Sequence, residues 1–317
     1  MDGYGERALK HFDHPAPHKP QHAPHAWIAP VYGRKTAQMP TPDPDEPILD
    51  KKGTHRVQSV SGKFLYYSNI DYCIKPALHE ISSQQAKPTK QTTEKCNMLM
   101  DYIHTYPNAV LRFYASDMIL NIESDAAYLV LPKARSRGAV HFFFGNDPKI
   151  KEQMDNAPFH VLCQTIKGVM SSAAEAETGG IYMGGKAACP LRIAAIELGH
   201  PQPPDGSPFK TDNSTAHGIL TSNMRQKLSK AFDMKFYWMK DRISQKQFDL
   251  IWAKGILNKA DYFTKHHPPW HHKKMRYKYL QRIAQLHHAF SALKCADQWR
   301  GCVTPGVLSR HLRAMLH

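Results

Sequence analysis

The chain has 317 residues, of which 42% are hydrophobic, so it is long enough for about two domains with a substantial buried core. Lysine and arginine outnumber aspartate and glutamate by 42 to 27, and the net charge of +15 favours a polyanionic partner such as nucleic acid, although a basic surface can also serve solubility alone. The six cysteines form no C-x-x-C pair, which argues against a zinc ribbon and a secreted disulfide framework, and no apolar stretch reaches the roughly 18 residues of a membrane span. We therefore predict an intracellular protein, cytoplasmic or nuclear, that is not secreted and binds no membrane.

Residues 1–53 form a leader rich in proline and histidine, and nine of the 23 prolines of the chain lie within its first 50 residues. Proline lacks a backbone donor and has a fixed φ, so this leader is expected to be extended or loop-rich. Residues 54–109 change to a helical pattern, in which apolar residues such as Val57, Val60 and Phe64 recur at a spacing of three to four. This second region is predicted to be a small helical subdomain that serves as a packing scaffold.

Strand patterns dominate the start of the third region, residues 110–266. Four apolar runs separated by turn formers predict strands of an antiparallel meander at 110–115, 118–124, 138–145 and 159–166. The elements expected after them are a long helix from Ser171, a short strand near 209–211, a helix over 223–243, a strand over 247–253 and a short helix from Asn258. This order predicts an α/β domain with a mixed sheet, an antiparallel meander plus parallel strands, that is flanked by helices.

The last region, residues 267–317, is predicted to be a basic tail. From His266 to the C-terminus the chain has nine lysines or arginines and one acid, Asp297, which gives a net charge of +8. Residues 275–293 have the apolar spacing of an amphipathic helix. The histidine-rich string at residues 266–272 contains ligands that suit zinc, but its prolines and the lysines that follow favour a flexible cationic linker.

Four acidic residues in the third region, Asp125, Glu177, Asp212 and Asp261, are candidate metal ligands. Phosphodiester hydrolysis by two Mg²⁺ ions about 4 Å apart requires a small cluster of hard oxygen ligands, which carboxylates supply. Each acid also has a structural interpretation: Asp125 could cap a turn at the end of its strand, Asp212 could cap the next helix, and Glu177 and Asp261 could stabilise the start of a helix. Glu175 competes with Glu177, because residues two apart on a helix point in different directions.

The segments around these acids resemble those of a known family. The strings ESDAAYL (123–129), SSAAEAET (171–178), KTDNSTA (210–216) and NKADYFTKHHP (258–268) resemble, in this order, the metal-ligand segments of the ribonuclease H (RNase H) module of copia-type LTR retrotransposon polyproteins. Residues 4–27 and 40–50 resemble the segments that follow the polymerase palm in these polyproteins, and residues 54–109 resemble the tether between polymerase and RNase H. The chain contains no Asp-Asp pair of the kind that a polymerase palm needs.

The resemblance implies an RNase H-like fold and an RNA–DNA hybrid as substrate. It implies that Asp125, Glu177, Asp212 and Asp261 are the catalytic ligands of two Mg²⁺ (or Mn²⁺) ions for hydrolysis of the RNA strand, with the polymerase part of a retroelement polyprotein as a further partner. Basic and polar residues near the acids are expected to contact the hybrid, namely Lys133, Arg135, Arg137, Asn213, Ser214, Lys227, Lys230 and Lys265. For the lysines of the predicted 223–243 helix, a solvated surface is an equal alternative.

The chain departs from the family pattern after Glu177, where Gly179, Gly180, Gly184 and Gly185 stand in place of helix formers. Each glycine inside a helix costs about 1 kcal/mol relative to alanine, so the helix that carries Glu177 is expected to fray. A second hypothesis follows, in which the chain is a catalytically decayed, retroelement-derived nucleic-acid-binding or scaffold protein. Cleavage of a labelled RNA–DNA hybrid in the presence of Mg²⁺ would separate the two hypotheses.

Overall fold

The computed structural model describes residues 3–29, 43, 45–151, 156–222 and 230–280, and for residues 230–233 only the backbone. The elements before the sheet are α1 (Tyr4–His11), α2 (Lys51–Tyr67), the 3-10 helix η1 (Tyr72–Ile74), α3 (Lys75–Gln84) and α4 (Lys90–Thr105). They are followed by β1 (Ile119–Leu131), β2 (Arg135–Gly145), β3 (His160–Thr165), α5 (Ala173–Glu197), β4 (Ser207–Thr211), α6 (Ser214–Thr221), α7 (Lys230–Ser244), β5 (Phe248–Trp252), the 3-10 helix η2 (Gly255–Leu257), α8 (Asp261–Thr264) and α9 (Pro269–Tyr279). None of the described helices is long and apolar enough to cross a membrane.

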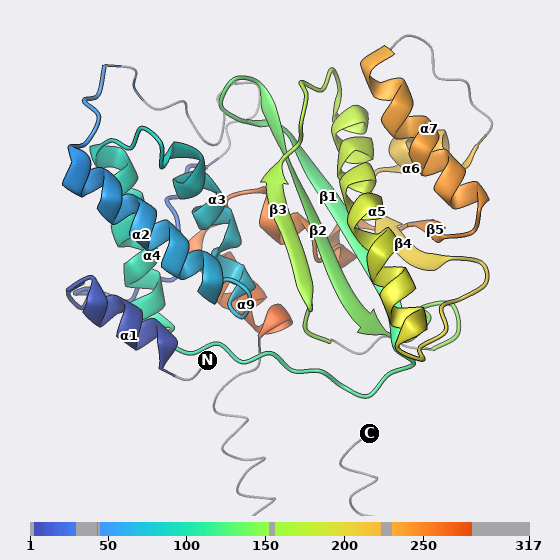
Figure 1. Cartoon of the computed structure of the whole chain (residues 1–317), viewed down its shortest axis with the longest axis horizontal. Helices are drawn as coiled ribbons and strands as arrows, with labels where there is room; N and C mark the ends of the chain where they lie inside the picture. Colours follow the sequence, from blue (N-terminus) through green and yellow to red (C-terminus); the bar gives the residue numbers. More distant parts are fainter. Residues whose placement is uncertain (1–2, 30–42, 44, 152–155, 223–229, 281–317) are drawn as a thin grey trace, which may run out of the picture. The chain divides into compact units, whose positions relative to one another are not determined.

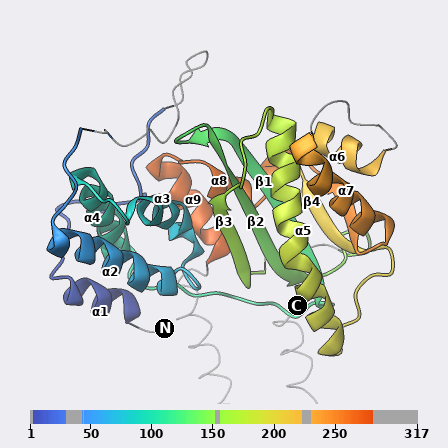
Figure 2. The same ribbon diagram turned by 45° about the horizontal axis from the view of Figure 1, so that its top comes forward.

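A five-stranded mixed sheet is the centre of the third region (Figure 1). Its strand order is β3-β2-β1-β4-β5, with antiparallel pairing among β1, β2 and β3 and parallel pairing of β1 with β4 and of β4 with β5. The long helix α5 lies across β1 and β2, and α7 packs beside α5 (Figure 2). The predicted fold class, an RNase H-like mixed sheet flanked by helices, is therefore confirmed.

The core of this region is formed by large apolar side chains from both layers. Ile122 of β1, Phe142 of β2 and Phe209 of β4 are fully buried and pack with Ile181 of α5 and Met239 of α7. Helix α8 contacts β1 and β2 as well. Because α5 and α8 pack on β1 and β2, nearly all residues of these two strands are buried. The alternation of buried and exposed residues that is typical of a half-exposed strand is therefore absent from them.

The helices expected over residues 54–109 are present as α2, α3 and α4. Asp50 caps α2 by accepting a hydrogen bond from the Gly53 N–H (2.7 Å), and Val57, Val60 and Phe64 form the buried face of that helix. The leader is more ordered than predicted, because it contains α1, which packs on the same core. Between α1 and the next element, the described leader residues have no regular structure, as their prolines lead us to expect.

The helix that carries Glu177 is continuous, so the expected fraying is wrong. Helix α5 runs from Ala173–Glu197 without interruption, and the Ser172 side chain caps it by accepting a backbone hydrogen bond from the first turn (3.2 Å). Its glycines lie where the helix touches other elements: a Cβ atom on Gly184 would lie 2.8 Å from the Phe209 ring. Packing against the sheet therefore outweighs the poor helix propensity of glycine.

Two strand predictions differ from the structure. Residues 110–115 form no strand; they contact the loop before β3, where the Ala157 N–H donates to the Arg112 carbonyl (2.9 Å) and the Asn156 side chain bonds to the Tyr114 backbone. The strand predicted over 118–124 continues to Leu131 and forms a hairpin with β2. Asp125 therefore lies inside β1, paired with Ala139, and does not end its strand.

The helix predicted over 223–243 also differs. The structure has an additional helix, α6, immediately after β4, and α7 begins at Lys230. Residues 223–229 lie outside the described part of the chain. The string after β4 contains capping residues followed by apolar ones, which is the ordinary signal for the start of a helix.

Residues 267–280, which were assigned to the basic tail, are packed against the rest of the chain. Arg276 of α9 is 3% exposed and donates to the Asp71 carboxylate (2.7 Å) and to the Tyr102 hydroxyl (2.7 Å). Tyr279 is also buried and donates to the Lys259 carbonyl (2.6 Å). The remainder of the predicted tail, including most of the predicted 275–293 helix, lies outside the described residues.

Candidate metal centre

Three acids from distant parts of the sequence come together beside the sheet. Asp125 lies in β1, Glu177 lies in the first turns of α5, and Asp212 directly follows β4. Each offers a carboxylate oxygen, and these oxygens all lie within 4.8 Å of one another. We call these three residues the acid group. In the part of the chain that the structure describes, no other set of three His, Cys, Asp or Glu side chains is gathered so closely.

The topology of the sheet explains why the acid group forms. Strands β1 and β4 are parallel neighbours, in register at Ile122 and Phe209, so Asp125 within β1 and Asp212 directly after β4 lie at the same level along the two strands. Helix α5 packs directly on β1. Gly180 is part of this contact, because a Cβ atom there would lie 3.4 Å from the Asp125 carbonyl oxygen. The first turns of α5 are thereby held next to the acids of the sheet.

Glu177 is the most strongly perturbed acid of the group. It is 6% exposed, and the Ala126 backbone N–H donates to its carboxylate. Burial, together with the charges of Asp125 and Asp212, raises the pKa of Glu177 to about 9. The other candidate, Glu175, accepts a hydrogen bond from the Ser171 N–H (2.8 Å) at the start of the helix. The structure therefore places Glu177, and not Glu175, in the acid group.

Asp125 is 3% exposed, and the Thr264 hydroxyl donates to its Oδ2 atom. Burial raises the pKa of Asp125 to about 6, and the Lys265 ammonium opposes this rise. The carboxylate is thus held in place by the end of α8, which packs on β1. The turn-capping interpretation of Asp125 does not apply, because this residue lies within a strand.

Asp212 is half-buried between β4 and α6. Burial raises the pKa of its carboxyl, while a hydrogen bond from the Asn258 side chain lowers it. The Trp252 indole N–H donates to the Asp212 backbone carbonyl (2.9 Å). The residue that caps α6 is Asn213, whose side chain accepts from the Ala216 N–H (2.9 Å). The carboxylate of Asp212 is therefore not used as the helix cap.

Asp261, the fourth candidate, begins α8 and lies outside the set of oxygens within 4.8 Å. Its Oδ1 atom contacts the Lys265 ammonium, one helical turn later. Its charge nevertheless acts on the acid group, since it raises the pKa of both Asp125 and Asp212. Asp261 is thus adjacent to the acid group but already has a cation as its partner.

The acid group fits a hard divalent cation. Its donor atoms are all carboxylate oxygens, which suit Mg²⁺ or Mn²⁺ better than softer metals. The Oε2 atom of Glu177 is buried and accepts no hydrogen bond from the described residues. Burial raises the pKa values of all three carboxyls, and the repulsion among neighbouring carboxylates adds to this rise. A bound cation would remove this repulsion.

The residues predicted to contact nucleic acid occupy different environments. Lys133 is exposed in the turn between β1 and β2, Arg135 is half-buried at the start of β2, and Ser214 is exposed at the start of α6. Lys265 is paired with Asp261. Lys227 lies outside the described residues, and the side chain of Lys230 is not described.

Arg137 is not available at the surface. Its side chain is fully buried in β2, and its guanidinium donates to the His79 Nδ1 atom (3.3 Å). Burial, with the charge of Arg137 beside it, lowers the pKa of His79 to about 3. The prediction that Arg137 contacts a phosphate is therefore wrong for this conformation, because β2 is covered at this position by the helical region.

The histidine-rich string at residues 266–272 is packed, so its interpretation as a flexible linker is wrong. His266 and His272 are buried, and the His25 ring stacks on His266 with ring centroids 3.7 Å apart. His272 is hydrogen-bonded to the Tyr262 hydroxyl (2.6 Å). Apolar and aromatic neighbours explain the packing, since neutral imidazole rings can enter such a core.

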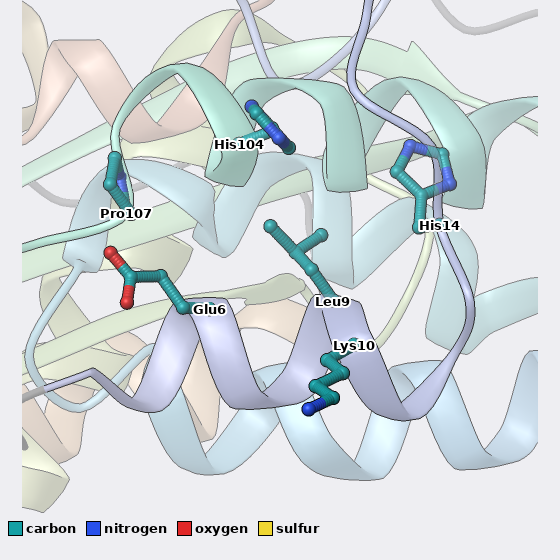
Figure 3. A pocket seen from close by; sticks show the side chains of 6 residues that line it. All are labelled: Glu6, Leu9, Lys10, His14, His104 and Pro107. Carbon is teal, nitrogen blue, oxygen red and sulfur yellow. The ribbon is translucent and has the colours of Figure 1, made fainter.

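A hollow of about 430 Å³ lies between α1 and α4, away from the elements that carry the acid group. Figure 3 shows the side chains that line it: Glu6, Leu9, Lys10, His14, His104 and Pro107. Its His14 is already hydrogen-bonded to Asp101 (2.7 Å). The hollow gathers no set of three metal-binding side chains, so we assign no chemistry to it.

Sequence reasoning missed the residues that support the acids. Thr264 holds Asp125, and Asn258 connects two parts of the site: its side chain donates to the Ser124 carbonyl (2.7 Å) and to the Asp212 carboxylate. Both belong to the string NKADYFTK that surrounds Asp261. The concentration of polar residues in this string was the available signal.

No protein-family model and no curated protein matches the chain. Among solved structures, the chain is similar to an N-terminal RNase H domain from Mycobacterium tuberculosis, which was determined as a fusion with maltose-binding protein. The two chains are 16% identical, the match covers 46% of this chain and 89% of that chain, and the TM-score is 0.30. It is similar to RNase H1 from the halophilic archaeon Halobacterium salinarum with 13% identity, coverage of 45% and 92%, and a TM-score of 0.28. It is also similar to the protease-reverse transcriptase of prototype foamy virus, with 16% identity and a TM-score of 0.29, covering 70% of this chain and spanning 27% of that protein.

Proposed function

We propose that the chain is a copia-type RNase H module that hydrolyses the RNA strand of an RNA–DNA hybrid with two divalent cations, Mg²⁺ or Mn²⁺. The observation that carries the proposal is Glu177. It is buried with Asp125 and Asp212, and one of its oxygens has no partner among the described residues. A buried carboxylate in this position requires a proton or a cation, and a site of this kind in a chain with a net charge of +15 suits a polyanionic substrate.

The residues of the chain would bind and orient the reacting groups. Asp125, Glu177 and Asp212 would hold one cation, and Asp261 would contribute to the second position. When bound, the two cations lower the pKa of the attacking water and stabilise the leaving 3′ oxygen. Thr264 supports this arrangement, because its hydroxyl fixes the orientation of the Asp125 carboxylate before any ligand arrives.

A proton on Glu177 couples cation binding to pH. Because the pKa of Glu177 is raised to about 9 in the cation-free protein, its carboxyl group is protonated at neutral pH. Binding of a cation requires the carboxylate, so this proton has to leave. Cation affinity is therefore expected to increase with pH through the neutral range.

The substrate would lie across the acid group, with contacts from the residues beside it. Lys133 and Lys265 are candidates for phosphate contacts. Ser214 is exposed two residues after Asp212 and is a candidate for a 2′-OH contact, which would select RNA. The polymerase part of a retroelement polyprotein is the proposed partner of the helical region, because residues 54–109 resemble a tether.

The test is cleavage of a labelled RNA–DNA hybrid by the purified chain in Mg²⁺. We expect RNA-strand cleavage by the parent protein and cleavage at background level by Asp125→Asn and Asp212→Asn. Glu175→Gln is the matched control, since Glu175 lies near the same site but outside the acid group, and it should cleave like the parent. Equal cleavage by all four proteins would contradict the metal site. Salt-sensitive binding of the hybrid without cleavage would favour the alternative, a decayed nucleic-acid-binding scaffold protein.

A further inference from the structure

Lys265 occupies a special position beside the acid group. It follows α8 directly, one turn after Asp261, and its ammonium contacts the Asp261 Oδ1 atom. The residue before it, Thr264, is fully buried, and its hydroxyl donates a hydrogen bond to the Asp125 carboxylate. The backbone at this point is therefore fixed against β1, whereas the Lys265 side chain, 44% exposed, has a flexible stem.

The charge of Lys265 acts on every one of the four candidate ligands. It interacts electrostatically with Asp125, Asp212 and Asp261, and it also acts on Glu177. An ammonium at this point therefore compensates part of the repulsion among the carboxylates. A divalent cation would have the same effect at the same place.

We propose that Lys265 is a built-in counter-ion that occupies the Asp261 side of the site and has to leave Asp261 when a divalent cation binds there. This inference rests on the proposed function, which identifies the site as a metal centre. The two cation positions are then unequal. The position at the acid group contains a carboxylate oxygen that has no partner in the described part of the chain, and the position at Asp261 is occupied by the Lys265 ammonium.

After displacement from Asp261, Lys265 would also contact the nucleic acid. Its ammonium would then lie beside the bound RNA strand and pair with a phosphate oxygen of that strand. Cation occupancy at Asp261 and phosphate binding by Lys265 would then favour each other, because each frees the group that the other needs. Lys265 would act as a positioning residue.

A purely structural role has to be separated from this one. An ion pair four residues apart on a short helix contributes little to stability when it is partly exposed. Such a pair could affect thermal unfolding, but it would leave the affinity of the site for a metal ion unchanged. Metal affinity, measured without nucleic acid, is therefore the decisive readout.

The experiment is calorimetric titration of the full chain with Mn²⁺ at constant pH, combined with thermal unfolding in EDTA. Lys265→Met removes the charge and keeps the length of the side chain. We expect its weaker Mn²⁺ position to bind at least about tenfold more tightly than in the parent, and we expect its EDTA-treated form to unfold at a lower temperature that Mn²⁺ restores. Lys265→Arg should keep the weak affinity of the parent.

Lys254→Met is the matched control, because Lys254 is exposed in the neighbouring loop and its replacement lowers the net charge equally. Its two Mn²⁺ affinities should remain within about twofold of those of the parent. Identical affinities for Lys265→Met and the parent would overturn the counter-ion role while leaving the metal centre intact. A parent protein that binds no Mn²⁺ would overturn both this inference and the proposed function.

Discussion

Replacement of Glu177 by glutamine is expected to stabilise the cation-free protein at neutral pH. The folded state raises the pKa of Glu177 from its ordinary value of 4.5 to about 9, so the folded protein keeps a proton that the unfolded chain releases. The contribution of Glu177 to the free energy of unfolding therefore falls as pH rises above 4.5, by about 1.4 kcal/mol per pH unit. From pH 4.5 to pH 7 this amounts to roughly 3 kcal/mol, which the glutamine variant would not lose.

The assay is urea unfolding of the parent and of Glu177→Gln at pH 5, 6, 7 and 8 in EDTA. The two proteins should have nearly equal stability at pH 5, and the variant should become progressively more stable than the parent towards pH 8. Saturating Mg²⁺ should remove the difference, because the cation stabilises the parent. Glu175→Gln, outside the acid group, should show no such pH-dependent gain. Parallel loss of stability by the parent and Glu177→Gln across this range would refute the reasoning.

Two further predictions concern the packing of α5 and the buried histidines. Gly184→Ala places a methyl group 2.8 Å from the Phe209 ring and should lower the free energy of unfolding by about 1–3 kcal/mol. Gly218→Ala is the control: open space surrounds this position, so the substitution should raise the free energy of unfolding by about 0.5–1 kcal/mol. Equal changes for the two variants in urea unfolding would contradict the close approach of Gly184 to Phe209. The pKa of His266 and of His272 is lowered to about 2, mainly by burial and further by neighbouring cationic and imidazole groups. The folded protein therefore does not take up the protons that these two rings bind in the unfolded chain below pH 6.5. The contribution of these two rings to stability should therefore decrease from pH 6.5 to pH 4.5, so over this range the difference in stability between His272→Asn and the parent should shift in favour of the variant. A constant difference in urea unfolding would argue against the burial of this ring.

Most strands and helices could be predicted from local patterns, but not which strands pair with one another. The runs at 138–145 and 159–166 became β2 and β3, since apolar β-formers bounded by turn residues are a reliable local signal. The run at 110–115 has the same composition and forms no strand. The difference is the pairing partner: β2 and β3 pair with strands of the sheet, whereas residues 110–115 do not join the sheet. Local composition contains no information about which strand edges are available for pairing.

The acids of the site could be named from the sequence, but not their roles. Asp125 and Asp212 meet because β1 and β4 pair in parallel, a contact between residues 87 positions apart in sequence. Arg137 shows the opposite outcome, since its segment looked like an exposed basic turn. In the structure it is part of a strand that is covered by other elements, so its charge is buried. Only the tertiary arrangement decides between these two outcomes.

The glycines after Glu177 support a cation site at this position. A Cβ atom on Gly184 would lie 2.8 Å from the Phe209 ring, so glycine there allows α5 to lie close to the sheet. This closeness buries Glu177 beside two other carboxylates, and its Oε2 atom has no partner among the residues that the structure describes. The same sequence feature that weakens the helix as an isolated segment therefore helps to create an anionic pocket, which Lys265 neutralises only in part. Burial of the Glu177 carboxyl requires a proton or a cation, and a bound divalent cation would also remove the repulsion among the three acids.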